Sequence, residues 1–475
     1  MWIGFASIRS SCLSKYYPPP LYPLALNIMN IYSNPLSKGL RLTALALASM
    51  TCMALATTGC SDDDDACAPS VPSGIDPTQV HHVMQKSTKR GVGYSFQLPV
   101  VDMLLLQDGI SWFYNWGNDC PDDVVTEAKR YGITYVPMAW NNNYNKTSIV
   151  NSVSAFGDPY LLAFNEPNLT DQCNMTPAQA AQYWPELKKF AQDNGLQIVS
   201  PAMNYGTLAG YADPVKWLDE FFAQPGVSLD DVCAIALHCY QNNASGLKGF
   251  IDKFEKYGKP IWLTEFCAWD GGVANVEAQM NYMTETLAYL EENPRVERYG
   301  WFIPRYNGAP YMALLSDEEL TDLGRVFVNA SSADKYAFAL PGNQWPAVHF
   351  QSSNASEGVE PGSAFSAAPH QVISTEGTLG SSTGTQISAF TTNKWLQYGV
   401  HNTESTQTIS LRVKTTVETQ ISLTVDGIEP EDTHILNSHG DWQTIELPLE
   451  LAKGVHTVKI KVVKGSMAMG WVMWQ

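Results

Sequence analysis

Two glutamates stand at the ends of two apolar segments, where a pair of carboxylates could carry out acid–base and nucleophilic chemistry. Glu166 lies in Tyr160-Leu-Leu-Ala-Phe-Asn-Glu-Pro-Asn168, and Glu265 lies in Pro260-Ile-Trp-Leu-Thr-Glu-Phe266. Each segment has the composition and the bounds of a short buried strand. A carboxylate at the carboxyl end of a buried parallel strand is costly, and barrel enzymes keep their catalytic groups there. Two such carboxylates facing one cavity are what the hydrolysis of a glycosidic bond requires.

The elements that would position these glutamates alternate between strand-like and helix-like segments. Amphipathic helix patterns cover Thr176–Asn194, where Thr176 is a candidate N-cap followed by Pro177, as well as Val215–Phe222 and Val276–Asn293. The predicted strands are Gly91–Phe96, Ser111–Trp116, Thr134–Trp140, Tyr160–Asn165, Gln197–Met203, Cys233–Tyr240, Pro260–Phe266 and Arg298–Pro304. Eight strands alternating with helices predict an α/β fold, a (β/α)8 TIM barrel over residues 81–343.

The pattern changes near Pro341–Pro346. From residue 347 to residue 475 the chain has short alternating segments separated by Ser, Thr and Gly, and no convincing helix pattern. The clearest strand-like segments are Thr408–Lys414, Gln420–Val425, Trp442–Leu447 and His456–Val463. Short strands with this spacing predict a smaller all-β sandwich domain after the barrel.

Size and composition fit this organisation. The 475 residues suffice for a barrel of about 250 residues and a second domain. The net charge is 29 − 47 = −18, which disfavours nucleic acid as a partner and suits a neutral ligand. The chain has 14 Trp and 22 Tyr, which either fill cores and cover surfaces or provide flat faces for sugar rings.

The N-terminal region is predicted to be a targeting segment rather than part of the fold. Lys38 and Arg41 precede the uncharged stretch 42–59, which ends at Cys60 and is followed by an acidic tract. This resembles a bacterial lipoprotein signal over residues 1–60, lipidated on Cys60, with residues 61–80 as a polar linker and Met29 as an alternative start. The resemblance implies a bacterial outer membrane lipoprotein exposed at the cell surface. An uncleaved anchor helix and an ordinary secretory signal are the alternatives.

Cysteines and metal ligands give little further direction. Six cysteines follow Cys60, and 15 pairings are possible, so none is assigned. No His/Cys group has metal-ligand spacing and no Gly-rich phosphate loop is present. We therefore expect no metal and no organic cofactor.

Several further side chains could line a site around the glutamates. Asn165 precedes Glu166 and would suit a hydrogen bond to a sugar 2-hydroxyl. Alternation places Trp112, Tyr114 and Trp116 on one face of the second strand, where they either line a cleft or fill the barrel. Trp140 and Trp269 follow strand ends and are further candidates for sugar stacking.

Six motifs in barrel order carry a family resemblance: Lys89-Arg90-Gly91, Trp112-Phe-Tyr-Asn-Trp116, Val136-Pro-Met-Ala-Trp140, Leu161-Leu-Ala-Phe-Asn-Glu-Pro-Asn168, Ser200-Pro-Ala202 and Leu263-Thr-Glu-Phe266. From Lys86 to Phe327 the chain resembles glycoside hydrolase family 128, the endo-β-1,3-glucanases of clan A. The resemblance implies that Glu166 is the acid/base and Glu265 the nucleophile.

The resemblance also implies roles for residues at other strand ends. His238 and Tyr240 would flank the nucleophile, with Cys239 where the family usually has an aromatic residue, so that this wall of the site is expected to differ. Trp301 on the eighth strand would form a floor under the sugar at the cleavage point.

The C-terminal region resembles a carbohydrate-binding module of family 6. The matching segments are Trp395-Leu-Gln-Tyr398, Ile409-Ser-Leu-Arg-Val413, Gly440-Asp-Trp442 and Gly454-Val-His-Thr-Val458. The Asn that such modules usually carry before a late Trp is missing from Met467-Ala-Met-Gly-Trp471. A purely structural sandwich is therefore the alternative to a sugar-binding one.

These observations favour a surface-anchored, monomeric, retaining endo-β-1,3-glucanase that acts on laminarin-type glucans. A retaining hydrolase of another β-glycan keeps the same mechanism with a different substrate. A surface glycan-binding protein without catalysis and a structural surface protein are alternatives of other classes.

Overall fold

The computed structural model describes residue 72 and residues 74–269, 273–354, 366–369 and 385–475. The chain divides into two compact units, Met1–Cys67 and Ala68–Gln475, and all described residues lie in the second. The predicted lipoprotein signal, Met29 and Cys60 therefore fall outside the described residues. Within the described residues, no helix has both the length and the apolar character needed to cross a membrane.

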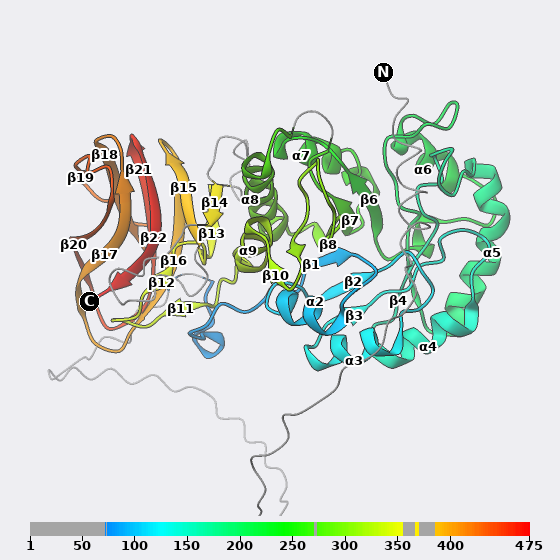
Figure 1. The fold of residues 1–475 in the computed structure, drawn as a ribbon, viewed down its shortest axis with the longest axis horizontal. Coiled ribbons are helices and arrows are strands. Elements are labelled where there is room, and N and C mark those ends of the chain that lie inside the picture. The colour runs from blue at the N-terminus through cyan, green and yellow to red at the C-terminus, as the bar shows by residue number, and fades with distance from the viewer. Residues whose placement is uncertain (1–71, 73, 270–272, 355–365, 370–384) are drawn as a thin grey trace, which may run out of the picture. The chain divides into compact units, whose positions relative to one another are not determined.

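Parallel strands form the inner layer of the first domain, with helices around them (Figure 1). Six strands pair in the order β3-β2-β1-β8-β7-β6, and β4 pairs with β5. Parallel bridges from Met138 to Leu162 and from Val199 to Ala234 place β4 and β5 between β3 and β6, as in an eight-stranded barrel. The eight predicted strands are confirmed as β1 (Arg90–Gly93), β2 (Trp112–Tyr114), β3 (Thr134–Tyr135), β4 (Tyr160–Leu162), β5 (Gln197–Val199), β6 (Ile235–Cys239), β7 (Ile261–Phe266) and β8 (Val296–Trp301).

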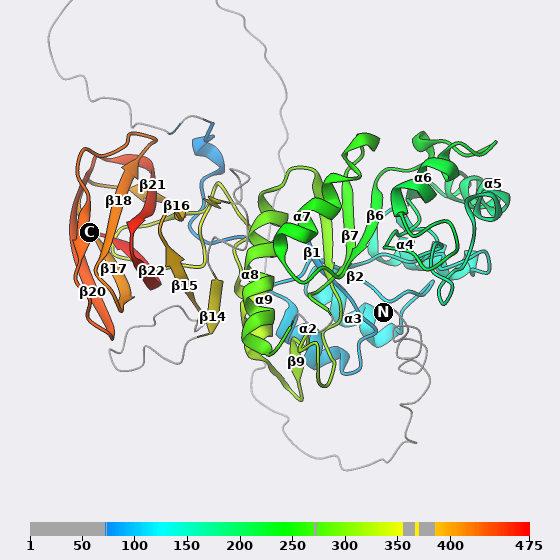
Figure 2. The same ribbon diagram turned by 90° about the horizontal axis from the view of Figure 1, so that it is seen from above.

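Helices alternate with these strands and lie outside them, as Figure 2 shows from a second direction. The helices of the described residues in this domain are α2 (Pro99–Leu106), α3 (Asp122–Arg130), α4 (Lys146–Phe156), α5 (Pro177–Asp193), α6 (Pro214–Phe222), α7 (Ala244–Asp252), α8 (Val276–Glu292) and α9 (Asp322–Asn329). The three predicted helices are confirmed as α5, α6 and α8. The N-terminus of α5 is fixed by a capping box, in which Thr176 and Gln179 satisfy each other's backbone N–H groups.

The interior of the barrel is filled by side chains that point inward from the strands. Trp112 stacks on Tyr114 with ring centroids 6.1 Å apart and packs against Trp262 at 5.6 Å. The Arg298 guanidinium lies 4.5 Å from the centroid of the Trp262 ring. The remaining members of this buried cluster are Val136, Met138, Leu162, Val199, Ala202, Ala234 and Ala236. The barrel therefore has a solid core below its catalytic end.

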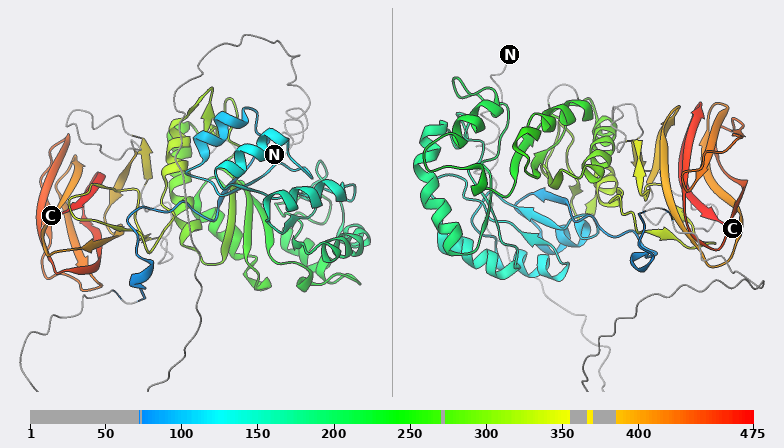
Figure 3. Two further views of the ribbon diagram at one scale, coloured as in Figure 1. Left: turned by 90° about the horizontal axis from the view of Figure 1, so that it is seen from below. Right: turned by 180° about the vertical axis from the view of Figure 1, so that it is seen from behind.

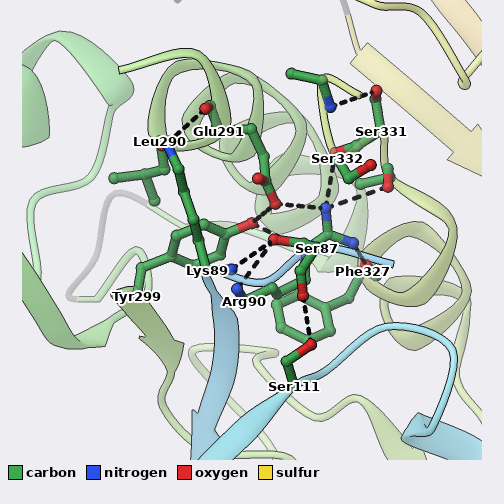
Figure 4. A network of polar contacts seen from close by, with 12 residues as sticks. Ser87, Lys89, Arg90, Ser111, Leu290, Glu291, Tyr299, Phe327, Ser331 and Ser332 are labelled. Atoms are coloured by element: carbon green, nitrogen blue, oxygen red, sulfur yellow. Dashed lines mark hydrogen bonds and ion pairs between the residues drawn. The ribbon is translucent and has the colours of Figure 1, made fainter. Parts of the chain in front are cut away.

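A buried arginine joins the first strand to the segment that leaves the barrel (Figure 4). Arg90 at the start of β1 donates from Nη2 to Glu291 Oε1 at 3.0 Å and from Nε to the Tyr299 hydroxyl at 2.9 Å. The same guanidinium donates to the carbonyl oxygens of Phe327, Ala330 and Ser331 at 2.7, 3.1 and 2.7 Å. The Arg90 and Glu291 side chains are 1% and 2% exposed, so this ion pair is shielded from water. Because all five contacts use one planar group, Arg90 fixes α8, β8 and the end of α9 together.

The C-terminal residues form two layers that are antiparallel except for the parallel pair β11 and β16, visible from two directions in Figure 3. The predicted strands are confirmed as β17 (Thr406–Thr415), β18 (Thr419–Val425), β20 (Trp442–Leu451) and β21 (Gly454–Lys464). One sheet runs β11 (Phe338–Ala339), β16 (Trp395–Asn402), β21, β18 and β19 (His434–Leu436), and β13 (Ser352–Ser353) joins it on β16. The other runs β14 (Ser366–Pro369), β15 (Thr385–Thr391), β22 (Ser466–Trp474), β17 and β20, and β12 (Trp345–Pro346) joins it on β22. The predicted β-sandwich is thus present.

Candidate active site

The two glutamates meet around one histidine. Nδ1 of His238 lies 2.9 Å from Oε1 of Glu166 and 3.4 Å from Oε2 of Glu265. The exposed fractions of Glu166, His238 and Glu265 are 0%, 0% and 2%. One carboxylate oxygen of each glutamate and a ring nitrogen of His238 lie within 4.8 Å of one another. Strands β4, β6 and β7 thus bring one acid pair and one imidazole to a single buried point.

An extra residue in β7 turns Glu265 toward the barrel axis. Leu237 of β6 pairs with Leu263 of β7, but the next residue, His238, pairs with Glu265, so that Thr264 has no partner in this register. Trp262 points inward and Leu263 packs against the outer core, which by strict alternation would point Glu265 outward. The bulge at Thr264 reverses that direction, as bulges next to active sites commonly do.

Glu166 adopts a backbone conformation that few residues of its type adopt. Its φ is +42°, in the left-handed region. The backbone compensates, because the Glu166 N–H donates to the Ala202 carbonyl at 3.0 Å and the Glu166 carbonyl accepts from the Leu169 N–H at 3.0 Å. Held in this way between β5 and its own turn, the side chain is directed at His238.

Three aromatic donors orient the carboxylate of Glu265. The Tyr114 hydroxyl and the Trp116 indole N–H donate to Oε1 at 2.9 and 2.7 Å, and the Tyr240 hydroxyl donates to Oε2. Burial, followed by the negative charge of Glu265, raises the pKa of Tyr114 well above its ordinary value. Tyr114 therefore keeps its proton and remains a donor at neutral pH.

Glu166 has a different set of neighbours. Its Oε1 accepts a hydrogen bond from Nδ2 of Asn204 at 3.0 Å and contacts Nδ1 of His238. Nε2 of His238 is buried and has no hydrogen-bond partner among the described residues. Because an ionised carboxylate can only accept, the proton of a neutral His238 belongs on Nδ1 when Glu166 is ionised.

Aromatic rings extend from Glu265 along one side of the site. Phe302 packs edge-on against Trp116 and Tyr240 with centroids 5.8 and 5.6 Å apart. Trp269 continues the row, 5.6 Å from Tyr240 and 6.3 Å from Tyr306. This row of Trp116, Phe302, Tyr240, Trp269 and Tyr306, called the aromatic wall below, offers apolar faces suited to the C–H faces of sugars.

Asn165 and Trp140 also lie at this end of the barrel. The Asn165 side chain is 3% exposed, and its Nδ2 donates to Gln172 Oε1 at 3.1 Å. Its Oδ1 is buried without a hydrogen-bond partner among the described residues. The Asn165 N–H donates to the Trp140 carbonyl, and the half-buried Trp140 side chain packs against the barrel interior.

Two predicted substrate contacts lie elsewhere. Trp112 is 1% exposed and donates to the Lys89 carbonyl at 2.9 Å, so it fills the barrel interior below the glutamates rather than the cleft. Trp301 is fully buried, donates to the Met312 carbonyl at 2.8 Å and packs against Phe266 on the outer side of the strands. Alternation along β8 explains this, because the following residue, Phe302, points into the site in its place.

Cys239 does not alter the wall of the site, contrary to expectation. It is 2% exposed and belongs to the core between strands and helices, because it alternates with His238 and Tyr240 along β6. Burial raises the pKa of its thiol to about 12. Cys120, Cys173, Cys233 and Cys239 are free thiols, the buried Cys267 contacts Met312 Sδ through its Sγ at 3.7 Å, and Cys67 lies outside the described residues.

Sequence reasoning missed Asn204, Phe302 and Gln172. Asn204 follows Ala202 just beyond β5, so the rule that active-site residues cluster at the carboxyl ends of strands would have found it. Phe302 was masked by the more conspicuous Trp301 beside it. Gln172 lies in the turn that follows Asn-Glu-Pro-Asn, where no pattern marks the direction of a side chain.

The Glu166, His238 and Glu265 atoms are close enough together to hold a cation. Three of the carboxylate oxygens, however, already accept hydrogen bonds from Asn204, Tyr114, Trp116 and Tyr240. Donors placed in this way suit a pair of carboxyl groups that gain and lose protons, which is acid–base and nucleophilic chemistry at a buried centre.

Comparisons with known proteins give matches to both parts of the chain. Residues 91–327 match the model of the glycosyl hydrolase catalytic core, and residues 363–473 match that of carbohydrate binding module family 6. A family 128 (subgroup II) endo-β-1,3-glucanase from Pseudomonas viridiflava is 39% identical, with 51% of this chain and 98% of that chain covered and a TM-score of 0.48. One from Sorangium cellulosum is 34% identical, with 50% and 97% covered and a TM-score of 0.46.

A curated relative extends the similarity to a fungus. Alkali-sensitive linkage protein 1 of Schizosaccharomyces pombe is 28% identical over 263 residues, which are 51% of this chain. The match covers 45% of this relative, so the chain spans about half of its length. The matched catalytic core makes the present chain a glycoside hydrolase. The chain is 39% and 34% identical in sequence to the two bacterial enzymes over nearly their whole length, which shows that it belongs to glycoside hydrolase family 128.

Proposed function

We propose that this chain is a retaining endo-β-1,3-glucanase acting on laminarin-type glucans. The observation that carries the proposal is the buried pair Glu166 and Glu265 on either side of His238. Retaining glycosidases separate their carboxyl groups by roughly 5–5.5 Å, whereas inverting ones leave roughly 6.5–9.5 Å for a water. One carboxylate oxygen of Glu166 lies within 4.8 Å of one of Glu265, and this short separation favours the retaining arrangement.

The neighbours of each glutamate support its role. Glu265, oriented by three aromatic donors, attacks the anomeric carbon while Glu166 gives its proton to the departing glycosidic oxygen. A covalent glycosyl–Glu265 ester results. Water then attacks the same carbon, Glu166 takes the water's proton, and Glu265 is released as a carboxylate. The buried Oδ1 of Asn165, which lacks a partner among the described residues, suits a hydrogen bond from a sugar hydroxyl.

The family and the aromatic wall support this choice of substrate. The two bacterial relatives are described as endo-β-1,3-glucanases, and the match to this chain covers 98% and 97% of their length. Tyr240, Trp269 and Tyr306 offer ring faces beside the nucleophile that suit neutral glucose units. The match to family 6 supports the C-terminal sandwich as a second glucan-binding domain. We infer a monomer that needs no metal.

Hydrolysis of defined polysaccharides tests the proposal. The chain from residue 61 onward is incubated with laminarin, barley mixed-linkage glucan, xylan and mannan, and the products are separated by size. We expect short β-1,3-oligosaccharides from laminarin, and NMR of the first products should show the β-anomer. Glu166→Gln and Glu265→Gln should each lower the rate at least about a thousandfold. Glu186→Gln, which makes the same change in a surface ion pair, is the matched control. Normal rates in both site variants would overturn the proposal, and products from another polymer would overturn its substrate.

We further propose that the chain is anchored in the bacterial outer membrane by a lipid on Cys60 and is exposed at the cell surface. The charged residues Lys38 and Arg41, the uncharged stretch and the small residues before Cys60 support this. Metabolic labelling with a fatty-acid analogue should mark the wild-type chain but not Cys60→Ala. Equal labelling of both would refute the anchor.

A further inference from the structure

Hydrogen bonds hold the Asn204 side chain so that its amide NH2 group, and not its amide oxygen, faces Glu166. Its Oδ1 accepts the Tyr205 backbone N–H at 2.8 Å, which fixes the amide orientation and turns Nδ2 toward Oε1 of Glu166 at 3.0 Å. Its backbone carbonyl accepts from Nδ2 of Asn168 at 2.6 Å. Asn204 therefore presents a donor, rather than an acceptor, to the acid/base residue.

The loop that carries Asn204 is tied to the turn that carries Glu166. Asn168, two residues after Glu166, is fully buried, and its carbonyl accepts the N–H groups of Thr207 and Leu208 at 3.0 and 2.9 Å. A Cβ on Gly206 would lie 2.5 Å from that same carbonyl oxygen, so the close approach requires glycine. The two loops are thus joined over several residues, and Asn204 keeps its place relative to Glu166.

The donors around Glu166 distinguish its two oxygens. Oε1 faces the Asn204 N–H and Nδ1 of His238, which carries a proton when His238 is neutral and Glu166 is ionised. An acid O–H on Oε1 would point at the Asn204 N–H, which cannot accept it, whereas Oε1 as a bare acceptor satisfies that N–H. Among the described residues, titratable groups that face Glu166 include His238 from β6, Glu265 from β7 and Tyr114 from β2.

We propose that Asn204 is a positioning residue that reserves Oε1 of Glu166 as an acceptor and so places the transferable proton on Oε2. The inference rests on the proposed function, in which Glu166 protonates the departing sugar oxygen. Asn204 acts through Glu166 and supplies no proton itself. The same contact supports the second step, because a fixed Oε1 leaves Oε2 to take the proton of the attacking water.

Two variants separate this role from simple packing. Asn204→Leu keeps the approximate size and removes the donor. Asn204→Asp keeps an acceptor for the Tyr205 N–H and puts a carboxylate beside Oε1, where the two acids share a proton and hold it away from Oε2. Asn151→Leu, an exposed position on α4, makes the first change away from the site. Circular dichroism of each variant verifies folding, and Asn204→Asp keeps the test open if Asn204→Leu does not fold.

The measurement is kcat/KM on two substrates that differ in their need for an acid. Laminari-oligosaccharides need a protonated leaving oxygen, whereas 2,4-dinitrophenyl laminaribioside does not. We expect Asn204→Leu to lose about tenfold and Asn204→Asp about a hundredfold on the oligosaccharide, with less than about threefold on the dinitrophenyl substrate. In Asn204→Asp the alkaline limb of the oligosaccharide pH profile should move about one unit higher, because a neighbouring carboxylate favours the protonated pair.

The outcomes distinguish this inference from the proposed function. Equal losses on both substrates by folded Asn204 variants, or no loss on either, would overturn the positioning role while the wild type remained a glucanase. A wild type inactive on both substrates would overturn the proposed function, and the inference with it. Selective loss on the oligosaccharide, matched by Glu166→Gln and absent in Asn151→Leu, would support both.

Discussion

Removing the Arg90 guanidinium should cost a large part of the stability of the barrel. Arg90→Met keeps an apolar stem but leaves the carboxylate of Glu291 buried without its cationic partner, which costs about 3–5 kcal/mol. The carbonyl oxygens of Phe327, Ala330 and Ser331 also lose their donor, at about 1 kcal/mol each. We therefore expect a loss of about 6–8 kcal/mol, against total stabilities of about 5–15 kcal/mol for folded proteins.

Urea unfolding followed by tryptophan fluorescence measures this loss as a change in midpoint at constant slope. Arg90→Met/Glu291→Leu should recover about half of the loss, because no unpaired buried charge remains. Arg130→Met is the matched control, since the Arg130 side chain is 61% exposed and its ion pair with Glu127 should contribute little. A loss of less than about 1 kcal/mol in Arg90→Met would refute the reasoning, as would a double variant less stable than the single one.

The remaining predictions concern protonation and two tryptophans, Trp112 in β2 and Trp116 just after it. Burial raises the pKa of Glu285 to about 7, against a smaller opposing effect of Lys394. Between pH 4.5 and 7, native Glu285 keeps a proton that the unfolded chain releases above its ordinary pKa of 4.5, so the stability of the fold should decrease over this range. Glu285→Gln should therefore raise Tm at pH 8 and leave it unchanged at pH 4. Burial, and then Arg90, lowers the pKa of His349 to about 4. The unfolded chain therefore takes up the proton first as pH falls from 6.5 to 4, and thermal melts of His349→Gln should show less acid destabilisation than the wild type. Trp116→Phe, which loses the donor to Glu265, should lower kcat/KM on laminari-oligosaccharides about tenfold. Trp112→Phe should instead lower Tm and leave kcat/KM within about twofold of the wild type. The reverse pattern would contradict the placement of Trp116 in the site and of Trp112 in the barrel interior.

The fold was predictable because its signals are local and repeated. Each strand is a short apolar segment bounded by polar residues or breakers, and helix signals such as Thr176-Pro177 before α5 mark the connections. Strand ends were less predictable. The segment 134–140 was expected to be one strand, but β3 ends at Tyr135, because Pro137 has no N–H to continue the ladder.

Site residues were predictable where the chain order fixes them and not where the direction of a side chain matters. Glu166, His238, Tyr240 and Glu265 lie at or just after the carboxyl ends of buried strands, and such ends converge in a barrel. Trp112 shares a face with Tyr114 and Trp116, yet it lies deeper along β2 and fills the interior. Alternation gives the face of a strand but not the depth at which a side chain leaves the core. Depth depends on how far neighbouring strands extend, which is a property of the whole sheet.

Glu265 shows why direction itself can escape a sequence pattern. Counting from the inward-facing Trp262, strict alternation assigns Glu265 to the outer face, where a buried carboxylate would meet apolar helices. The extra residue Thr264 in β7 reverses the direction, and Glu265 then pairs in register with His238. Thr264 itself is fully buried, with its hydroxyl 3.4 Å from the Leu237 carbonyl, so the bulge is held by the neighbouring strand. The nucleophile therefore depends on a local break in strand regularity, which only the pairing of β6 with β7 reveals.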